Sequence, residues 1–219
     1  MYDQKLIHTV GKWFALSHQA SRRYSEKHGE QAAQVQMWDE IHDAILKGAP
    51  ISEEDKAAMA DPKQFGVIHG DINISNYFYV PEEETLFVFD WDQVQRGWYM
   101  WDFAQAIYFV FVTADTGDLF TGTGKFPECD PERFLAYIIE GYESVAGAGS
   151  VDREQLQRMI ALRNYFVETF CREAIKQGDI PASMDGFCRI MLGYYEKKRA
   201  GFYDKKEDEG EKGGAGASE

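Results

Sequence analysis

The chain has 219 residues, of which 44% are hydrophobic and 15% aromatic, enough to fill the core of one large domain or two small ones. Asp and Glu number 37 against 23 Lys and Arg, giving a formal charge of −14, so a polyanion would be repelled over most of the surface. This balance argues against a nucleic-acid partner. The acidic excess is typical of soluble proteins, and it is also compatible with a cationic small-molecule substrate.

Targeting and cysteine patterns point to a cytoplasmic protein. The longest apolar stretch, residues 107–112, is far too short to span a bilayer, so no membrane partner is expected. Residues 1–5 are polar and lack the apolar core of a signal peptide. The three cysteines form no CxxC pair, which indicates neither a disulfide framework nor a zinc site.

The first third of the chain has a helical period. Apolar side chains recur at four-residue steps at Leu6, Val10 and Phe14, which predicts an amphipathic helix. A second helical pattern runs over residues 31–47, and Gly48 gives it a C-terminal stop.

The pattern changes after residue 64, where short runs of β-branched and aromatic residues begin. These runs predict strands at 66–69, 77–80 and 85–89. Helical periodicity then returns and predicts helices near 100–114, 131–146, 152–176 and 184–203. The charged, Gly-rich end, 204–219, predicts a disordered tail. The expected fold is therefore mainly α with a small β hairpin, forming one domain over residues 1–203.

The short polar motifs gather around the predicted hairpin. Phosphoryl transfer from ATP needs a base for the acceptor hydroxyl, oxygen ligands for Mg²⁺ and a means of holding the phosphates. Asp71 lies in a loop just after a strand and can accept the hydroxyl proton. Asn76, at the mouth of the next strand, offers an amide oxygen that suits Mg²⁺. Asp90 ends the following strand, so the turn brings it back to the side of Asn76.

The motifs of this hairpin are His69-Gly70-Asp71, Asn76 and Asp90-Trp91-Asp92. In this order they resemble the aminoglycoside phosphotransferase and choline kinase group, small-molecule kinases with a fold similar to the protein kinases. The resemblance implies an ATP- and Mg²⁺-dependent transfer to a hydroxyl, with Asp71 as catalytic base and Asn76 and Asp90 as Mg²⁺ ligands. Protein kinases carry Arg where Gly70 stands, whereas Gly is usual in the small-molecule branch.

Three further residues belong to this interpretation. His69 is expected to be a buried, hydrogen-bonded brace of the loop and not a base. Asp102, in the segment 101–104 that matches the family pattern, is implied to cap a helix and to brace the catalytic loop. For Asp92, a second metal contact, a substrate contact and a solvated turn residue all stay open.

The acceptor side is less constrained by the sequence. In this fold the acceptor lies between the catalytic loop and the C-terminal helices. The candidate contacts there are Trp98, Tyr99, Trp101, Glu168, Tyr194 and Tyr195. An aromatic and acidic lining would suit a cationic amine, although aromatic residues at helical spacing more often belong to a core. An aminoglycoside, choline, an amino-alcohol and a sugar all stay open as acceptors.

A complete kinase fold also has an N-terminal lobe, with a Gly-rich loop over the phosphates and a strand Lys paired to a helix Glu. No segment of the sequence has these features, so we expect a kinase-like C-terminal lobe with the N-terminal lobe absent. Such a lobe alone is expected to have weak or no phosphotransferase activity, because several groups that stabilise charge in the transition state are lost. An apolar surface bared near the first helix would favour self-association.

Two interpretations from different classes follow. The first is a small-molecule phosphotransferase, which the intact Asp71, Asn76 and Asp90 favour. The second is a non-catalytic kinase-like binding module, which the missing lobe favours. A metal-dependent hydrolase has little support, because no His cluster accompanies the carboxylates.

Overall fold

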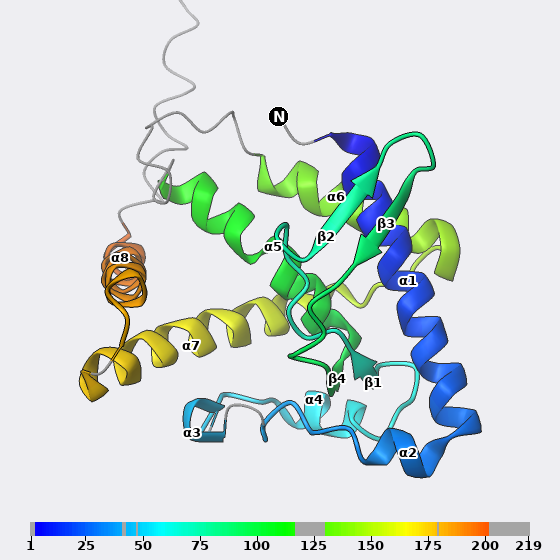
Figure 1. Ribbon diagram of the computed structural model, residues 1–219, viewed down its shortest axis with the longest axis horizontal. Coiled ribbons are helices and arrows are strands. Elements are labelled where there is room, and N and C mark those ends of the chain that lie inside the picture. Colours follow the sequence, from blue (N-terminus) through cyan, green and yellow to red (C-terminus); the bar gives the residue numbers. More distant parts are fainter. Residues whose placement is uncertain (1–2, 41–42, 47, 117–129, 179, 202–219) are drawn as a thin grey trace, which may run out of the picture.

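Helices make up most of the molecule. The computed structural model describes residues 3–40, 43–46, 48–116, 130–178 and 180–201, and Figure 1 shows their arrangement. The long helices are α1 (Gln4–Lys27), α5 (Tyr99–Thr116), α6 (Pro131–Ala146), α7 (Arg153–Gln177) and α8 (Ala182–Arg199). The short ones are α2 (Gly29–Ala33), α3 (Asp43–Leu46) and α4 (Glu53–Ala58). The predicted tail, 204–219, lies outside the described residues.

The strands form two small antiparallel sheets. One pairs β1 (Phe65–Ile68) with β4 (Gln95–Trp98), and the other is the hairpin of β2 (Tyr77–Val80) and β3 (Thr85–Val88). The mainly helical fold with few strands is confirmed. The expectation of a single hairpin was incomplete, since β4 was not predicted. Its sequence, Gln-Arg-Gly-Trp, has little intrinsic strand preference and becomes a strand by pairing with β1.

The helix predicted over residues 31–47 was wrong. α2 ends at Ala33, and Met37 then forms an isolated bridge with Arg96 beside β4. The Arg96 amide donates to the Gln36 carbonyl at 2.8 Å, and the Trp38 amide donates to the Arg96 carbonyl at 2.9 Å. Trp38 is buried against Trp98, with ring centroids 4.8 Å apart. The tertiary pairing therefore overrides the local helical pattern, and only the short α3 forms later in the segment.

α1 and α6 pack so closely that their backbones touch. A Cβ atom added to Gly11 would lie 2.1 Å from the Ile138 carbonyl oxygen, and one added to Gly141 would lie 2.1 Å from that of His8. Glycine at both positions is therefore required for this contact. The crossing fixes α1 against α6, and α5 packs against α6 and α7 in turn (Figure 1).

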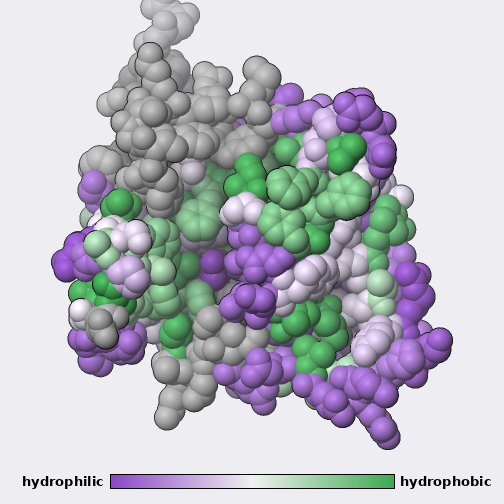
Figure 2. Space-filling view, viewed as in Figure 1, coloured by the Kyte–Doolittle hydropathy of each residue, from purple (hydrophilic) through white to green (hydrophobic). Residues whose placement is uncertain are grey.

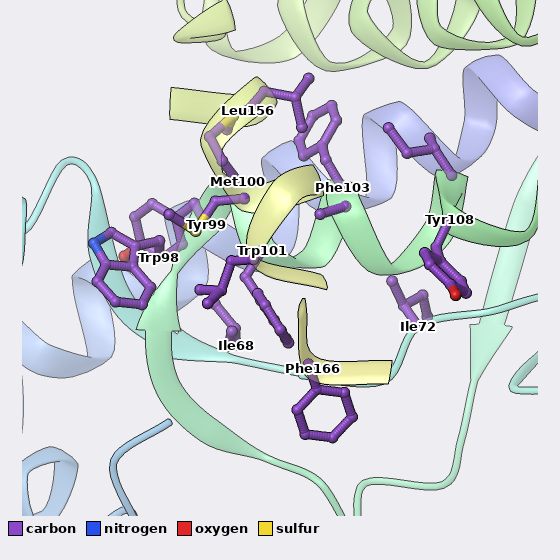
Figure 3. Packing of buried hydrophobic residues seen from close by; sticks show 14 of the residues in the cluster. Ile68, Ile72, Trp98, Tyr99, Met100, Trp101, Phe103, Tyr108, Leu156 and Phe166 are labelled. Atoms are coloured by element: carbon purple, nitrogen blue, oxygen red, sulfur yellow. The ribbon is translucent and has the colours of Figure 1, made fainter. Parts of the chain in front are cut away.

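The loop between β1 and β2 is anchored in the hydrophobic core at two points. Ile68, at the end of β1, is 1% exposed, and Ile72, within the loop, is fully buried (Figure 3). Each such side chain contributes about 1.5–3 kcal/mol by its removal from water. Because Asp71 lies between these two anchors, the core itself restricts where its carboxylate can lie.

The outer face of the hairpin is apolar. Figure 2 shows hydrophobic side chains gathered over β2 and β3. Phe78 and Phe87 are register partners in this hairpin and are more than half exposed, and the less exposed Phe89 has its ring centroid 4.9 Å from that of Phe78. Self-association through a bared apolar face stays a prediction. Among the described residues, no helix is both long and apolar enough to cross a membrane.

Candidate active site

The loop that carries Asp71 begins with a glycine that no other residue can replace without strain. Gly70 has φ +81°, in the left-handed region, and a Cβ there would lie 2.3 Å from the Gln93 carbonyl oxygen. The chain therefore turns sharply after His69, at the start of the loop that carries Asp71. The backbone conformation and the lack of space for a Cβ atom together explain why residue 70 is glycine.

Asp71 is partly buried and held by two amide side chains. Gln105, on α5, donates from Nε2 to Asp71 Oδ1 at 2.9 Å. Asn76 donates from Nδ2 to the Asp71 carbonyl at 2.7 Å and to Oδ2 at 3.3 Å. Burial raises the pKa of Asp71 above its ordinary value, opposed by the positive charge of Arg163 and by the amide hydrogen bonds. A carboxylate with a raised pKa is a better proton acceptor, so the site favours proton abstraction at this residue.

The amide of Asn76 is oriented by these bonds. Because its nitrogen faces Asp71, its oxygen faces the other way, and within the described chain Oδ1 accepts no hydrogen bond. Asn76 is 6% exposed. The preceding turn is closed by Asn73, whose Oδ1 accepts from the amide of Ser75 at 2.9 Å. The loop thus presents one amide oxygen next to the Asp71 carboxylate.

Asp90 is brought next to this loop by backbone bonds. The Phe89 amide donates to the Asn76 carbonyl at 3.0 Å, and His69 Nε2 donates to the Phe89 carbonyl at 3.1 Å. Asp90 itself is exposed and has φ 63°, a left-handed conformation that is uncommon outside glycine. Within the described chain its carboxylate makes no hydrogen bond to Asp71 or Asn76. Such backbone strain clusters at functional sites.

Asp92 and Trp91 complete the second turn. Asp92 is exposed and lies in a turn that the Val94 amide closes by donating to the Trp91 carbonyl at 3.0 Å. The Trp91 ring packs against His69, with centroids 4.6 Å apart, and against Trp13 of α1 at 6.2 Å. Trp91 therefore fixes the direction of the turn, whereas Asp92 is free to face solvent or a ligand.

His69 forms hydrogen bonds to both turns, and these bonds determine which of its ring nitrogens carries the proton. Its Nε2 must donate, because the Phe89 carbonyl can only accept, and its Nδ1 accepts from the Asp71 amide at 3.3 Å. The ring is fully buried. This placement agrees with the expected brace, since both ring nitrogens are used within the protein.

Asp102 holds the loop from behind. It is fully buried, and its Oδ1 accepts from the Gly70 amide at 2.9 Å while its Oδ2 lies 3.4 Å from the His69 amide. Asp102 is the fourth residue of α5, so it lies inside the helix and the expected capping geometry is not found. The bonds to the loop agree with the bracing role that the resemblance implies.

His18 is a partner of Asp102 that the sequence reasoning missed. Its Nε2 lies 3.3 Å from Asp102 Oδ2, and its Nδ1 lies 3.3 Å from the Tyr142 hydroxyl of α6. Burial lowers the pKa of His18, although Asp102 opposes this, so the ring is held neutral. A signal was available, since His18 lies four residues after Phe14 on the apolar face of α1.

A pocket of about 430 Å³ opens beside Asp71. Gln105 and Arg163 line it from α5 and α7, and most of the remaining lining is aromatic or aliphatic. The apolar side chains of the lining are Trp38, Leu46, Trp101, Phe166, Val167, Phe170, Met184 and Phe187. Its position next to the carboxylate makes it the candidate acceptor pocket. Neither Gln105 nor Arg163 was among the predicted site residues.

Of the predicted acceptor contacts, Trp101 lines the pocket and the other five do not. Trp98 is fully buried and donates from its indole nitrogen to the Asp55 carbonyl at 2.8 Å. Tyr99, Tyr194 and Tyr195 are buried in the core. Glu168 pairs with Arg172 at 2.6 Å and Arg199 at 2.8 Å.

The donor set near Asp90 fits a hard divalent cation. Among the described residues, no group of three or more His, Cys, Asp or Glu side chains could hold a metal alone. Mg²⁺, however, is usually bound by one or two carboxylates together with substrate phosphates and water. The unpaired oxygen of Asn76 and the exposed carboxylate of Asp90 are donors of this kind.

A partly buried carboxylate beside a pocket, with an amide oxygen and a second carboxylate on the adjoining turn, is what phosphoryl transfer to a small molecule requires. The model of the phosphotransferase enzyme family matches residues 8–150, more than half of the chain, and the chain belongs to this family. A comparison with curated proteins gives no match.

The fold is that of a kinase. Among solved structures, the chain is similar to amicoumacin kinase hAmiN in complex with AMP-PNP, Ca²⁺ and Ami, with a TM-score of 0.59 and 16% identity. The similarity covers 90% of this chain and 60% of that kinase, so the chain spans about 60% of the kinase's length. At this identity the likeness concerns the fold.

Proposed function

We propose that this protein is an ATP- and Mg²⁺-dependent phosphotransferase that acts on a hydroxyl of a small molecule. The observation that carries the proposal is the placement of Asp71, whose carboxylate is held by Asn76 and Gln105 at the wall of a pocket large enough for a small molecule. Family membership supports the reaction class, and the kinase fold supports a nucleotide as phosphoryl donor. The cytoplasm, where ATP and Mg²⁺ are abundant, is the proposed setting.

Asp71 is the proposed general base. Its carboxylate accepts the proton of the acceptor hydroxyl as the hydroxyl oxygen forms a bond to the γ-phosphorus and the bond to the β-phosphate oxygen breaks. Gln105 and Asn76 hold the two carboxylate oxygens in place, which fixes the direction of proton transfer. Burial keeps the pKa of Asp71 raised and makes the carboxylate more basic.

Asn76 and Asp90 are the proposed metal ligands, through Oδ1 and the carboxylate respectively. A bound Mg²⁺ would neutralise charge on the phosphates of the nucleotide. The two residues contribute by position: Asn76 is fixed by its bonds to Asp71, and Asp90 follows a residue whose backbone is bonded to Asn76 and His69. Asp92, exposed two residues further, is the proposed third oxygen donor.

The choice of acceptor is narrowed by the lining of the pocket. Glu168 was one reason to consider a cationic acceptor among those left open, but its carboxylate is already paired with two arginines outside the pocket. In the lining of the described chain, Asp71 is the sole carboxylate. The lining of the described chain therefore offers a cationic acceptor no carboxylate besides the proposed base.

Magnesium-dependent nucleotide binding tests the proposal first, because it does not depend on turnover. Wild-type protein should bind AMP-PNP in isothermal titration calorimetry with Mg²⁺ and much more weakly with EDTA. Asp90→Asn should abolish the magnesium dependence, whereas Glu83→Gln, the same charge change in the exposed hairpin turn, should preserve it. A transfer assay with radiolabelled ATP and a library of alcohols then tests the chemistry.

Absence of magnesium-dependent nucleotide binding in the wild-type protein would overturn the proposal. It would favour the non-catalytic binding module. Binding that survives Asp90→Asn unchanged would instead remove Asp90 from the site.

A further inference from the structure

Two polar atoms in the wall of the acceptor pocket are buried without a partner. One is Oε1 of Gln105, a residue that is 5% exposed, and the other is Nε of Arg163. Both residues line the pocket beside Asp71. Buried polar atoms in native proteins are nearly always hydrogen-bonded, so two such atoms in one wall indicate groups that a ligand satisfies.

Arg163 is surrounded by aromatic rings and lacks an anionic contact. Its guanidinium carbon lies 4.9 Å from the centroid of Phe166, 5.3 Å from that of Tyr108 and 6.0 Å from that of Trp101. Within the described chain Arg163 forms no hydrogen bond and no ion pair. The Tyr108 hydroxyl is itself bonded to the Tyr195 hydroxyl. The rings stabilise the cation but leave its donors unused.

The neighbouring charges of α7 do not compensate Arg163. Glu168, about one turn further along the helix, is paired with Arg172 and Arg199. The positive charge of Arg163 opposes the burial that raises the pKa of Asp71, but both Asp71 oxygens already accept from Gln105 and Asn76. In the lining of the described chain, Asp71 and Arg163 are the only charged residues. Once Asp71 acts as base, one positive charge is left to face the acceptor.

We infer that the acceptor is an alcohol that also carries a carboxylate, which Arg163 binds while Asp71 faces the hydroxyl. This inference rests on the proposed function and names the acceptor class of the same pocket. A guanidinium presents paired N–H donors that match a carboxylate, and the bond is strongest where water is excluded. The apolar lining holds the carbon skeleton between the two ends.

A carboxylate fits better than a phosphate or an amine. One guanidinium neutralises a single negative charge, so a phosphate dianion would keep an unpaired charge in an apolar wall. An ammonium group would lie against Arg163, with the aromatic faces nearby already occupied by the guanidinium. Oε1 of Gln105 can accept one further hydrogen bond from an O–H or N–H group of the same acceptor.

The test compares matched ligands on the same protein. Phenyllactate and para-(hydroxymethyl)phenylacetate, their methyl esters and the corresponding primary amines are titrated calorimetrically into the wild-type protein with Mg²⁺ and AMP-PNP. Each acid series keeps the hydroxyl and the ring and changes only the charged end. At least one acid should bind about tenfold or more tightly than its ester, as expected for a charge-assisted hydrogen bond. The amines should bind most weakly.

Variants then assign the preference to Arg163. Arg163→Met should abolish the preference for acid over ester, whereas Arg172→Met should preserve it. The control removes the same charge from the same helix at an exposed position outside the pocket. Circular dichroism and thermal unfolding check that the variants fold. Arg163→Lys keeps the charge but lacks the planar guanidinium, so it should reduce the preference for acid over ester. It replaces Arg163→Met in the test if the Met variant does not fold.

Each outcome decides the inference. It is overturned if no acid binds more tightly than its ester to the wild-type protein, if an amine binds most tightly, or if the preference survives both Arg163 variants. A weaker binding of Mg·AMP-PNP by Arg163→Met, with the acid preference intact, would assign the arginine to nucleotide phosphate instead and also overturn it. Failure of the proposed function is distinct, because it would appear as loss of magnesium-dependent nucleotide binding in the wild-type protein.

Discussion

The two turns that form the site are held in different ways. The turn around Asp71 is anchored by two buried isoleucines and by Asp102, whose carboxylate accepts hydrogen bonds from the loop backbone. The turn around Asp90 is exposed, left-handed and fixed through its backbone and the packing of Trp91. The proposed base is thus arranged by the protein alone, whereas the proposed metal-binding carboxylate keeps the freedom to adjust to a cation and its phosphates.

The largest expected effect comes from removing the base in the rigid turn. Asp71→Asn keeps the shape of the side chain but cannot accept the hydroxyl proton, so the rate of phosphoryl transfer should fall by about 10²–10⁴-fold. Binding of Mg·AMP-PNP should change much less, because Asp71 is not a proposed metal ligand and Asn76 keeps its bond to the carbonyl of residue 71. Transfer rates and calorimetric titrations on the same preparation check this, with Glu83→Gln as control. A rate within tenfold of wild type would contradict the assignment.

The next effect concerns the support behind the rigid turn. Asp102→Asn places an amide where two backbone N–H groups and His18 need an acceptor, so the free energy of unfolding should fall by about 3 kcal/mol. Asp92→Asn, in the exposed turn, should change it by less than about 0.5 kcal/mol. Urea unfolding measures both. Equal effects of the two substitutions would remove the distinction between the turns.

The left-handed residue of the exposed turn gives a smaller effect. Asp90→Val should lower the free energy of unfolding by about 1–2 kcal/mol, because a β-branched residue tolerates positive φ poorly. Asp92 does not have a positive φ, so Asp92→Val should cost less than about 0.5 kcal/mol. Urea unfolding at pH 7 makes the comparison. A neutral Asp90→Val would show that the turn relaxes freely in solution.

The pH dependence of stability gives the smallest effect. Burial lowers the pKa of His18 below its ordinary 6.5, so the unfolded chain binds more protons than the native one below that pH. Stability contributed by neutral His18 is present above about pH 6.5 and is lost as the pH falls toward the lowered pKa. Asp71, with its raised pKa, acts with the opposite sign, since its contribution is lost as the pH rises above 3.8.

Urea unfolding between pH 5 and 8 measures the contribution of His18. His18→Gln should flatten the decline of stability toward acid pH, whereas His28→Gln, which changes an imidazole not in contact with Asp102, should not. Identical pH profiles for wild type and His18→Gln would contradict a buried, neutral His18.

Local sequence patterns predicted the elements that depend on local signals. β2 was predicted with its observed bounds, and the apolar periodicity located α5, α6 and α7 to within about two residues at each end. β4 and residues 34–40 could not be predicted from local patterns. Their structure comes from the pairing of Met37 with Arg96, which lies 59 positions later in the chain (96 minus 37). Such pairing has no local signal in the sequence.

The same distinction holds for the site. Asp71, Asn76 and Asp90 could be proposed from the sequence because they lie close to one hairpin and have the spacing of a known motif. His18, Gln105 and Arg163 were missed because their role depends on how α1, α5 and α7 pack around the loop. Burial alone could not separate them from ordinary core polar residues. Their absence from the prediction is thus a consequence of tertiary geometry.

The close crossing of α1 and α6 has a consequence for the chemistry. Gly11 lies two turns before His18 on α1, and Gly141 directly precedes Tyr142 on α6, so the backbone contact sets the separation across which His18 bridges Tyr142 and Asp102. Asp102 in turn holds the Gly70 amide and, through it, the loop that carries the proposed base. We therefore expect a methyl group gained at either glycine to displace the loop that carries the proposed base, without changing any residue that lines the candidate pocket.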